Sequence, residues 1–440
     1  MMIEDTTIGL LCILASLVLV QSGMHIAVSL MLLSFIGVSL ILSFEVAGRM
    51  LASSAITSIS SYVFGVIPLF VLMGLLVAGT GLGRDLFDSA AKLLRRLLGG
   101  LGTATVAANA VFAACTGTSI ASASVFTRVA VPEMERHGYT TRFAVGVVAG
   151  SSILGMLIPP SLLFIIYGVI ANVSIGDLFI AGILPGILMA LAFTATIMAL
   201  CRFRPGFAYV AGRPAPRPTD AADEPLWRIL LPLLPVGALV FVVLGGIYGG
   251  FFTPTEAGGV GAAAALLIGL ARRELSLAKL WSIVLETGRV TAAICFLLMA
   301  AQIYSQMLTL SGLPSAANAW LQQAELGFLG FLLLYILVLI VLGMFLDSMS
   351  ILLIALPFAL PFALGFDMNL IWFAVVTIIA VEIGLLSPPL GIACFVIRAN
   401  LARDDVTMTD IFAGAAPFLL TMLAVLGLVV AFPWLSLALI

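Results

Sequence analysis

Two runs of small and hydroxyl-bearing residues interrupt apolar stretches of the sequence, and a Pro-Pro pair follows each run. The runs are 115–119 and 343–348, and the pairs are Pro159-Pro160 and Pro388-Pro389. Hydroxyl, carboxylate and carbonyl oxygens bind hard cations, and a proline pair splits a helix and frees carbonyl groups. We therefore expect a small cation such as Na⁺ to be bound by Thr118, Ser119, Ser151, Ser152, Gly155, Asp347, Ser348, Gly384 and Ser387.

A helix that starts at each run would direct its positive N-terminal end toward the same place. Such ends attract anions, so we expect a substrate carboxylate near the runs and the breaks. Two acidic residues leave alternatives open. Asp347 could bind a cation or cap the outgoing helix, and Glu382 is either functional or a protonated group bonded to a neighbouring helix. The residues expected around the substrate are Thr116, Gly117, Thr118, Pro159, Pro160, Ser161, Pro388 and Pro389.

The elements that must position these residues lie in a lipid bilayer. Of 440 residues, 62% are hydrophobic and 9% are charged, with a mean hydropathy of +1.26, whereas soluble domains carry roughly 25% charged residues. A net charge of −2 argues against nucleic-acid binding, which needs a basic surface. The five cysteines and two histidines lack metal-ligand spacing, and there is no Walker A motif for ATP. We also find no convincing Ser/His dyad or catalytic aspartate pair, so we do not expect an enzyme.

We expect an all-α polytopic membrane protein with about ten transmembrane helices and two re-entrant helical hairpins. Apolar runs long enough to span a bilayer lie near 8–22, 26–44, 63–80, 141–170, 178–201, 226–248, 254–271, 290–310, 369–397 and 411–436. Regions 101–131 and 328–362 contain the polar runs and are the predicted hairpins, which make no net crossing. All 19 Lys and Arg residues except Arg49 then fall on one side, and a crossing by either region would weaken this bias. The positive-inside rule makes that side cytoplasmic and places both termini outside.

An offset of 229 residues relates landmarks in the two parts of the chain. The related pairs are Pro132 and Pro361, Thr118 and Asp347, and Pro159 and Pro388. Matches at nearby offsets carry the similarity from Thr80 to Asp177 and from Ser311 to Asp410. Five predicted crossings separate matching elements, and because five is odd, the repeats are inverted across the membrane, as in many secondary transporters.

These landmarks predict two repeats and one linker. The first repeat, 1–202, has scaffold helices over 8–80, an arm over 81–98, a hairpin and broken helix over 101–170, and a helix over 178–201. A cytoplasmic linker covers 203–225. The second repeat, 226–440, has scaffold helices over 226–310, an arm over 311–326, a hairpin and broken helix over 328–397, and a helix over 411–436.

Short motifs along the chain carry a family resemblance. They are Ile67-Pro68-Leu69-Phe70, Gly117-Thr118-Ser119-Ile120-Ala121-Ser122, Gly155-Met156-Leu157-Ile158-Pro159-Pro160-Ser161, Phe252-Thr253-Pro254-Thr255-Glu256-Ala257, Gly343-Met344-Phe345-Leu346-Asp347 and Ser387-Pro388-Pro389-Leu390-Gly391. With them the sequence, over about residues 8–436, resembles the large membrane subunit of a tripartite ATP-independent periplasmic (TRAP) transporter of the C4-dicarboxylate-type permease family. Ser387 stands where the family usually has a threonine or a similar residue, which keeps the hydroxyl group.

The resemblance implies an elevator-type carrier in the bacterial cytoplasmic (inner) membrane, with both termini periplasmic. It implies two protein partners: a small four-helix membrane subunit, expected as a separate chain, and a periplasmic substrate-binding protein that delivers an organic acid. It also implies Na⁺ as the coupling ion, without ATP. The residues leave one alternative open, a standalone Na⁺- or H⁺-coupled dicarboxylate carrier, which shares the inverted-repeat arrangement.

Overall fold

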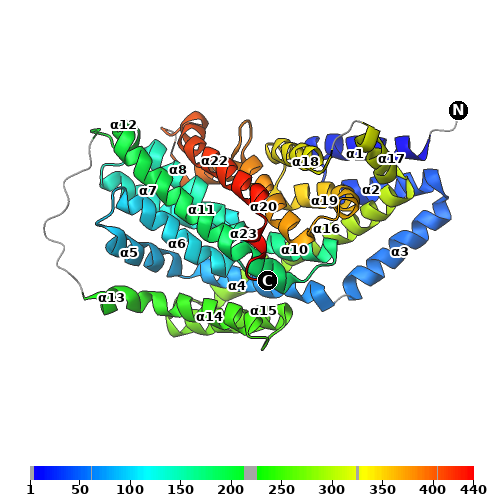
Figure 1. The fold of residues 1–440 in the computed structure, drawn as a ribbon. Coiled ribbons are helices and arrows are strands. Elements are labelled where there is room, and N and C mark those ends of the chain that lie inside the picture. The colour runs from blue at the N-terminus through cyan, green and yellow to red at the C-terminus, as the bar shows by residue number, and fades with distance from the viewer. Residues whose placement is uncertain (1–3, 61, 213–224, 324–326, 404) are drawn as a thin grey trace.

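The computed structural model describes residues 4–60, 62–212, 225–323, 327–403 and 405–440 (Figure 1). Within these residues every regular element is a helix, and one isolated β-bridge joins Tyr139 to Tyr209. Most of the linker predicted at 203–225 lies outside the described residues. The protein is therefore all-helical, as the sequence predicts.

The first half of the chain contains a group of N-terminal helices, an arm, a hairpin and a broken helix (Figure 1). The N-terminal helices are α1 (Asp5–Gln21), α2 (Ile26–Ile41), α3 (Phe44–Ser60), the short 3-10 helix η1 (Tyr62–Gly65) and α4 (Val66–Gly79). The arm α5 (Leu82–Leu94) bends away from α4 by 63°. The first hairpin consists of α6 (Gly100–Thr116) and α7 (Ser119–Arg136). The broken helix consists of α8 (Thr141–Ser152), α9 (Leu154–Leu157) and α10 (Leu162–Ala171), and α11 (Ile175–Phe203) and α12 (Pro205–Ala208) follow it.

The second half contains the same elements in the same order. It begins with α13 (Leu226–Leu230), η2 (Leu231–Leu233), α14 (Leu234–Tyr248), α15 (Pro254–Ala271) and α16 (Leu277–Leu310). The arm is α17 (Leu313–Gln323), and the second hairpin consists of α18 (Phe328–Gly343) and α19 (Ser348–Gly365). The broken helix consists of α20 (Leu370–Leu386) and α21 (Ile392–Leu401), and α22 (Met408–Ala431) and α23 (Trp434–Leu437) end the chain.

The helix bounds repeat at the offset seen between the sequence landmarks. The second helices of the two hairpins, α7 and α19, begin at Ser119 and Ser348, which are 229 positions apart, and each has 18 residues. The same offset relates α8 and α9 to α20, and α2 to α15 within two residues at each end, so the repeat includes the N-terminal helices as well. The halves differ in one place: the first half has two helices, α3 and α4, where the second half has a single 34-residue helix, α16. The sequence predicted neither α3 nor the start of α16 at Leu277, well before 290.

Local sequence explains where the hairpins turn and where the long helices break. Helix α6 ends at Gly117, whose φ of 63° is a left-handed conformation that glycine adopts readily. Asp347 accepts hydrogen bonds from the backbone N–H groups of Met349 and Ser350 and so caps α19. Both long helices stop before their Pro-Pro pairs, because proline cannot donate the backbone hydrogen bond that a helix needs.

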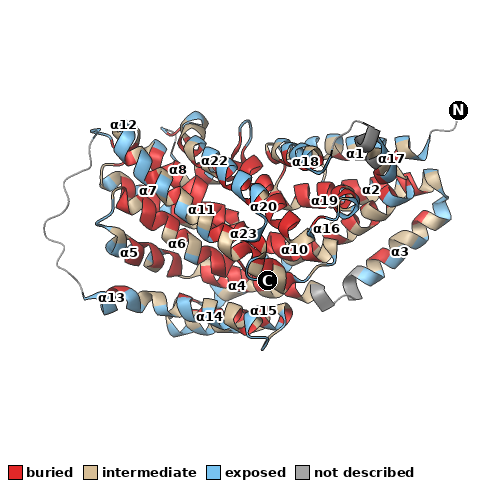
Figure 2. Cartoon of the chain, in the orientation of Figure 1, coloured by how far each residue is buried: buried red, intermediate tan, exposed pale blue. Residues whose placement is uncertain are grey.

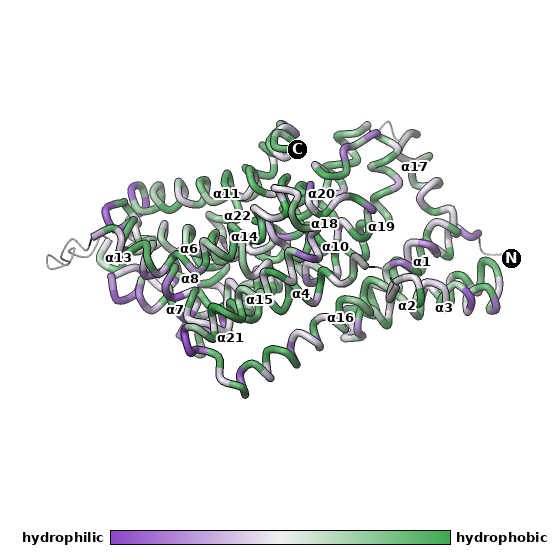
Figure 3. Tube along the Cα trace, turned by 90° about the horizontal axis from the view of Figure 1, so that it is seen from below, coloured by the Kyte–Doolittle hydropathy of each residue, from purple (hydrophilic) through white to green (hydrophobic). Residues whose placement is uncertain are grey.

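The hairpins and broken helices form the buried part of the molecule, and the N-terminal helices of each half lie around them (Figure 2). In the most apolar 18-residue stretch, 83% of residues are buried for Thr141–Ala171 and 67% for Ser348–Gly365, against 28% for Leu277–Leu310. The long helices are hydrophobic along most of their length, and hydrophilic stretches gather near helix ends, as around α7 and α13 (Figure 3). A helix that is apolar and yet exposed is typical of a surface that faces lipid.

Seven helices of the described residues are long and apolar enough to cross a membrane, or eight if α4 and α5 form one bent span. The sequence predicted ten. The apolar helices α1, α2 and α20 have 17, 16 and 17 residues, which at about 1.5 Å per residue is shorter than a hydrocarbon core of roughly 30 Å. Helix α19, one of the seven, belongs to the predicted second hairpin. Helix length therefore supports a polytopic membrane protein, but it does not confirm ten transmembrane helices.

One ion pair bears on whether the first hairpin crosses the molecule or returns to the end at which it entered. Asp85 precedes α6 and α7, and Arg272 follows them after four further predicted spans. The Arg272 Nη2 atom lies 2.6 Å from Asp85 Oδ2. Four crossings return the chain to the end where it started, so one crossing by α6 and α7 would place these two residues at opposite ends. The pair therefore agrees with a hairpin that enters and leaves at one end, here called the cation-rich end.

A second ion pair makes the same point for the second hairpin. Arg403 follows α18 and α19, and its Nη1 atom lies 2.8 Å from Oε2 of Glu135, which follows the first hairpin. If α20 and α21 together make one crossing, as the sequence predicts, six spans separate these residues apart from the second hairpin, and a net crossing by that hairpin would again separate them. Helix α16 brings the chain to the other end before α18 begins. With these predicted crossings the two hairpins would enter from opposite ends, which is the inverted arrangement that the sequence predicts.

Candidate functional site

The tip of the first hairpin packs onto the first Pro-Pro break. The Gly117 carbonyl oxygen accepts a hydrogen bond from Leu162 N at 3.2 Å, and a Cβ added at Gly117 would lie 2.7 Å from the Pro160 carbonyl oxygen. A Cβ added at Gly155 would meet the Thr118 backbone, with the carbonyl carbon at 2.7 Å. Pro159 and Pro160 are buried in this contact. The structure therefore brings together most of the residues that the sequence predicted for the first half.

Several predicted oxygen ligands in this half are already hydrogen-bonded within the helices. Ser152 donates to the Ala149 carbonyl at 2.9 Å, Ser161 donates to the Met156 carbonyl at 2.5 Å, and Thr116 donates to the Phe112 carbonyl at 3.1 Å. The Ser151 hydroxyl accepts from Asn109 Nδ2 at 2.8 Å. The oxygen Asn109 Oδ1 is buried without a hydrogen-bond partner. Asn109 was not among the predicted site residues, although an amide within the apolar region 101–131 could have indicated it.

At the tip of the second hairpin, Asp347 caps a helix, one of the two roles that the sequence left open. Its carboxylate accepts from Met349 N at 3.2 Å, from Ser350 N at 3.3 Å and from the Ser350 hydroxyl, so it acts as the cap of α19. The next residue, Ser348, is buried and donates from Oγ to Glu382 Oε1 at 2.8 Å. This bond joins the hairpin tip to the C-terminal part of α20, which ends at Leu386.

Glu382 also faces the tip of the first hairpin. Its carboxylate is fully buried, and Ser119, the first residue of α7, is the second side chain that interacts with it. Ser119 Oγ and Glu382 Oε2 are both buried. Ser119 and Ser348 occupy equivalent positions of the two halves. One carboxylate therefore lies between equivalent serines at the N-terminal ends of two helices.

The second Pro-Pro break differs from the first. Pro388 and Pro389 are exposed, whereas Pro159 and Pro160 are buried. Ser387 is buried and donates to the Ile383 carbonyl at 2.8 Å. Helix α21, which follows the second break, packs on α7 of the first hairpin, and α10 packs on α19 of the second. Each broken helix thus contacts the hairpin of the opposite half.

Close backbone contact holds the second hairpin against α20. A Cβ added at Gly384 would lie 2.6 Å from the Gly343 Cα, and a Cβ added at Gly343 would lie 2.6 Å from the Gly384 Cα. Gly384 was predicted to provide a carbonyl ligand. In the structure its lack of a side chain lets α18 and α20 touch two residues beyond Glu382.

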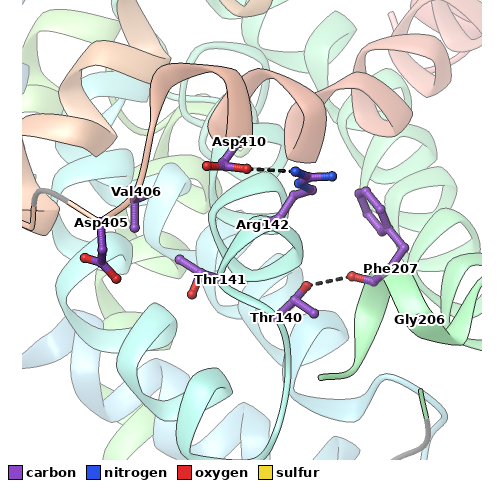
Figure 4. A pocket seen from close by; sticks show the side chains of 8 residues that line it. All are labelled: Thr140, Thr141, Arg142, Gly206, Phe207, Asp405, Val406 and Asp410. Carbon is purple, nitrogen blue, oxygen red and sulfur yellow. Dashed lines mark hydrogen bonds and ion pairs between the residues drawn. The ribbon is translucent and has the colours of Figure 1, made fainter. Parts of the chain in front are cut away.

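Two cavities lie away from the hairpin tips. One, of about 580 Å³, opens at the cation-rich end, where Arg142 reaches across to Asp410 at 2.8 Å and Thr140 donates to the Phe207 carbonyl at 2.6 Å (Figure 4). The Arg403 guanidinium lowers the pKa of Asp405, another residue of its wall. The other cavity, of about 630 Å³, is bounded by the α10–α11 and α14–α15 turns. Neither cavity is lined by a residue predicted to bind the cation or the substrate.

Comparison with known protein families assigns the chain to a family. A family model described as the tripartite ATP-independent periplasmic transporter, DctM component, matches residues 11–435. The chain belongs to this family. As a TRAP transporter large subunit it is a membrane transport protein, and its named relatives are permeases.

Among the relatives of this TRAP subunit, the C4-dicarboxylate TRAP transporter large permease protein DctM of Pseudomonas aeruginosa is 32% identical over 89% of each chain. The sialic acid TRAP transporter large permease protein SiaM of Vibrio cholerae is 30% identical over 96% of each chain. The 2,3-diketo-L-gulonate TRAP transporter large permease protein YiaN of Escherichia coli is 31% identical over 88% of each chain. These names differ in substrate, so the shared sequence specifies the subunit and not its cargo.

One solved structure resembles the TRAP subunit in fold. The YdaH transporter of Alcanivorax borkumensis superposes with a TM-score of 0.53, covering 87% of this chain and 90% of that one. Sequence identity is 16%, so the likeness concerns the fold alone. YdaH was described as having an unusual topology.

Proposed function

We propose that the protein is the permease subunit of a Na⁺-coupled TRAP transporter that imports an organic acid. The observation that carries the proposal is the meeting of two hairpin tips, one from each half, at a single buried polar cluster. Inverted repeats with broken helices are typical of secondary transporters that bind substrate and ion where the repeats meet. The C4-dicarboxylate, sialic acid and 2,3-diketo-L-gulonate permeases among its relatives support an organic acid as the cargo.

The proposed partners are a small four-helix membrane subunit and a periplasmic protein that binds the substrate and delivers it. Family membership supports both, because the family description names a tripartite periplasmic transporter. The exposed apolar helices offer a surface for lipid and for a membrane partner. We place the cation-rich end in the cytoplasm of a bacterial inner membrane and both termini in the periplasm.

The proposed transport cycle is of the elevator type. The buried hairpins and broken helices move as one body, and the N-terminal helices of each half stay in place around them. The buried fractions support this division, because Thr141–Ala171 is 83% buried and Leu277–Leu310 is 28% buried in the stretches compared. The tips and breaks that the sequence singled out carry Na⁺ and substrate through the cycle.

Uptake into proteoliposomes tests this function. The chain is reconstituted with its small subunit, the binding protein is added outside, and uptake of the organic acid that this protein binds is followed under an inward Na⁺ gradient. We expect uptake with Na⁺, no uptake when choline replaces Na⁺ or when the binding protein is omitted, and no requirement for ATP. Uptake without any binding protein would instead favour a standalone carrier, and uptake that is indifferent to Na⁺ would contradict the coupling.

A further inference from the structure

The span formed by α13, η2 and α14 is open to lipid along most of its length. In its most apolar 18-residue stretch, within Leu226–Tyr248, 28% of residues are buried. Trp227 and Arg228 lie in the first turn of this span, and the Arg228 Cζ atom is 5.2 Å from the centroid of the Trp227 ring. Trp227 is 60% exposed. A tryptophan at the end of a lipid-facing span is typical of the depth at which lipid headgroups lie.

The arm α5 brings further cations to this end of the span. Helix α5 packs against α13 and η2, and these elements lie at the same end of the molecule as α7 and α8 (Figure 1). The apolar side of the arm is buried, for example at Leu86 and Phe87. The cations at and just beyond the C-terminal end of the arm are exposed, although they also interact within the chain: Lys92, Arg95 and Arg96.

The two segments combine positive charge with exposed apolar side chains. The sequence has no acidic residue between Asp88 and Glu133, and Arg228 is the one charged residue of 225–255. Exposed leucines lie beside the cations in both segments. We call this surface the arm patch, and it consists of Lys92, Leu93, Arg95, Arg96, Leu97, Leu226, Trp227, Arg228 and Leu230.

The chemistry of the arm patch selects its occupant. Guanidinium groups present several N–H donors in a planar arrangement that fits phosphate oxygens. Basic clusters beside a membrane helix are typical of sites for anionic phospholipids. A zwitterionic lipid brings an ammonium group that the cations repel, and a soluble acidic ligand leaves the leucines and Trp227 uncovered. An anionic phospholipid satisfies both parts of the patch, because its phosphate meets the cations and its acyl chains meet the apolar side chains.

We propose that the arm patch binds the headgroup of an anionic phospholipid. The acyl chains of this lipid lie along the exposed face of α13 and α14, and its phosphate contacts the cations of the patch: Lys92, Arg95, Arg96 and Arg228. The inference needs the membrane location of the chain, and it does not depend on the proposed Na⁺ coupling or cargo.

The bound lipid joins two segments that are distant in the sequence. Helix α5 connects α4 to the first hairpin, and α13 begins the second half of the chain. A lipid that contacts both segments binds the folded arrangement and not the unfolded chain. It therefore stabilises the folded state, with a concentration dependence set by its affinity.

Thermal unfolding of the purified chain in dodecyl maltoside micelles tests the site. Phosphatidylglycerol is titrated into the micelles at constant ionic strength, and phosphatidylcholine with the same acyl chains and inorganic phosphate are titrated in parallel. The test variants are Arg228→Gln and the double variant Arg95→Gln/Arg96→Gln. The matched control is Arg202→Gln/Arg204→Gln, which removes two exposed cations at the C-terminal end of α11 and changes the net charge by the same amount as the double test variant.

The expected result is a saturable rise of the unfolding temperature with phosphatidylglycerol, and no such rise with phosphatidylcholine or inorganic phosphate. Each cation removed from the arm patch should raise the half-saturating fraction of phosphatidylglycerol about fivefold. The control should keep the wild-type value. Unfolding in phosphatidylcholine shows whether each variant folds, and Arg228→Lys, which keeps the charge, should recover part of the response if Arg228→Gln folds poorly.

Four results would overturn the proposal. If the test variants keep the wild-type response, the arm patch does not bind the lipid. If the control loses as much affinity as the double test variant, the cations act by general attraction to anionic micelles and there is no site. If inorganic phosphate stabilises as phosphatidylglycerol does, the ligand is a free anion. If the response disappears when the chain is purified together with its small subunit, a protein partner and not a lipid covers the patch.

Discussion

Replacing Gly384 with alanine should loosen the second hairpin and disturb the Glu382 cluster. A Cβ at this position would lie 2.6 Å from the Gly343 Cα and 2.8 Å from the Ile340 carbonyl oxygen, whereas carbon atoms in contact are about 3.5–4.0 Å apart. Helices α18 and α20 would have to separate by about 1 Å. Such overpacking costs about 1–3 kcal/mol, and the helix propensity of alanine offsets up to about 1 kcal/mol of it.

The net expectation for Gly384→Ala is a loss of about 0–3 kcal/mol in the free energy of unfolding. Gly427→Ala is the matched control, because Gly427 also lies inside a long helix, α22, and a Cβ there meets nothing within 4 Å. The control should gain up to about 1 kcal/mol. Unfolding in mixed detergent and SDS micelles gives both free energies under one condition.

The displacement should also reach the site. The bond from Ser348 Oγ to Glu382 Oε1 is 2.8 Å long, and a shift of about 1 Å would take it beyond hydrogen-bonding distance. We therefore expect Gly384→Ala to weaken the Na⁺ dependence of uptake, with Gly427→Ala unchanged. If the two variants are equally stable and equally Na⁺-dependent, the close contact of α18 with α20 does not hold the site.

Three further outcomes follow from polar contacts. A double-mutant cycle on Asp85→Ala and Arg272→Ala should give a coupling energy of about 0.5–2 kcal/mol in unfolding, because the pair is partly buried at 2.6 Å; additive effects would contradict the pairing and with it the route of the first hairpin. Although partial burial opposes ionisation, the N–H of Gly81 and the Arg272 guanidinium hold the pKa of Glu274 below its usual value. The stability that Glu274 contributes is thus present above about pH 4.3 and lost as pH falls through the lowered pKa, so Glu274→Gln should flatten an acid melting profile, and an unchanged profile would refute this. Asp347→Asn should unfold like the wild type, since asparagine also caps helices, while Asp347→Ala should lose about 1 kcal/mol; a loss of Na⁺-dependent uptake in Asp347→Asn alone would show a role beyond capping.

The sequence predicted the parts of the site that local chemistry determines. Gly117 and the two Pro-Pro pairs end helices for reasons that hold in any context, so the tips and breaks lie where they were expected. The offset of 229 also recurs in the helix bounds, although Pro132 and Pro361 lie inside α7 and α19 and do not mark helix ends. The helix over 44–60 was not predicted, since it is less apolar than its neighbours and its counterpart continues into α16.

Tertiary contacts determine what the sequence could not show. Glu382 could be named as an acid in an apolar span, but its bond to Ser348 depends on how α20 packs against the second hairpin. The different exposure of the two Pro-Pro pairs likewise depends on packing, because the local sequences are nearly the same. Asp347 caps α19 because of its side-chain conformation, and sequence spacing does not specify that conformation.

The central claim is that two inverted hairpins, neither of which crosses the membrane, bring their tips to one buried cluster. Labelling of single cysteines in intact cells with a membrane-impermeant maleimide tests it most directly, with Glu4→Cys, Arg136→Cys and Asp367→Cys introduced separately into a chain whose five native cysteines are replaced. Positions 4, 136 and 367 lie before the first span, after the first hairpin and after the second hairpin. The account predicts labelling at 4 and 367 and none at 136 until the membrane is permeabilised. Labelling at 136, or protection at 367, in intact cells would show that a hairpin crosses and would contradict the account.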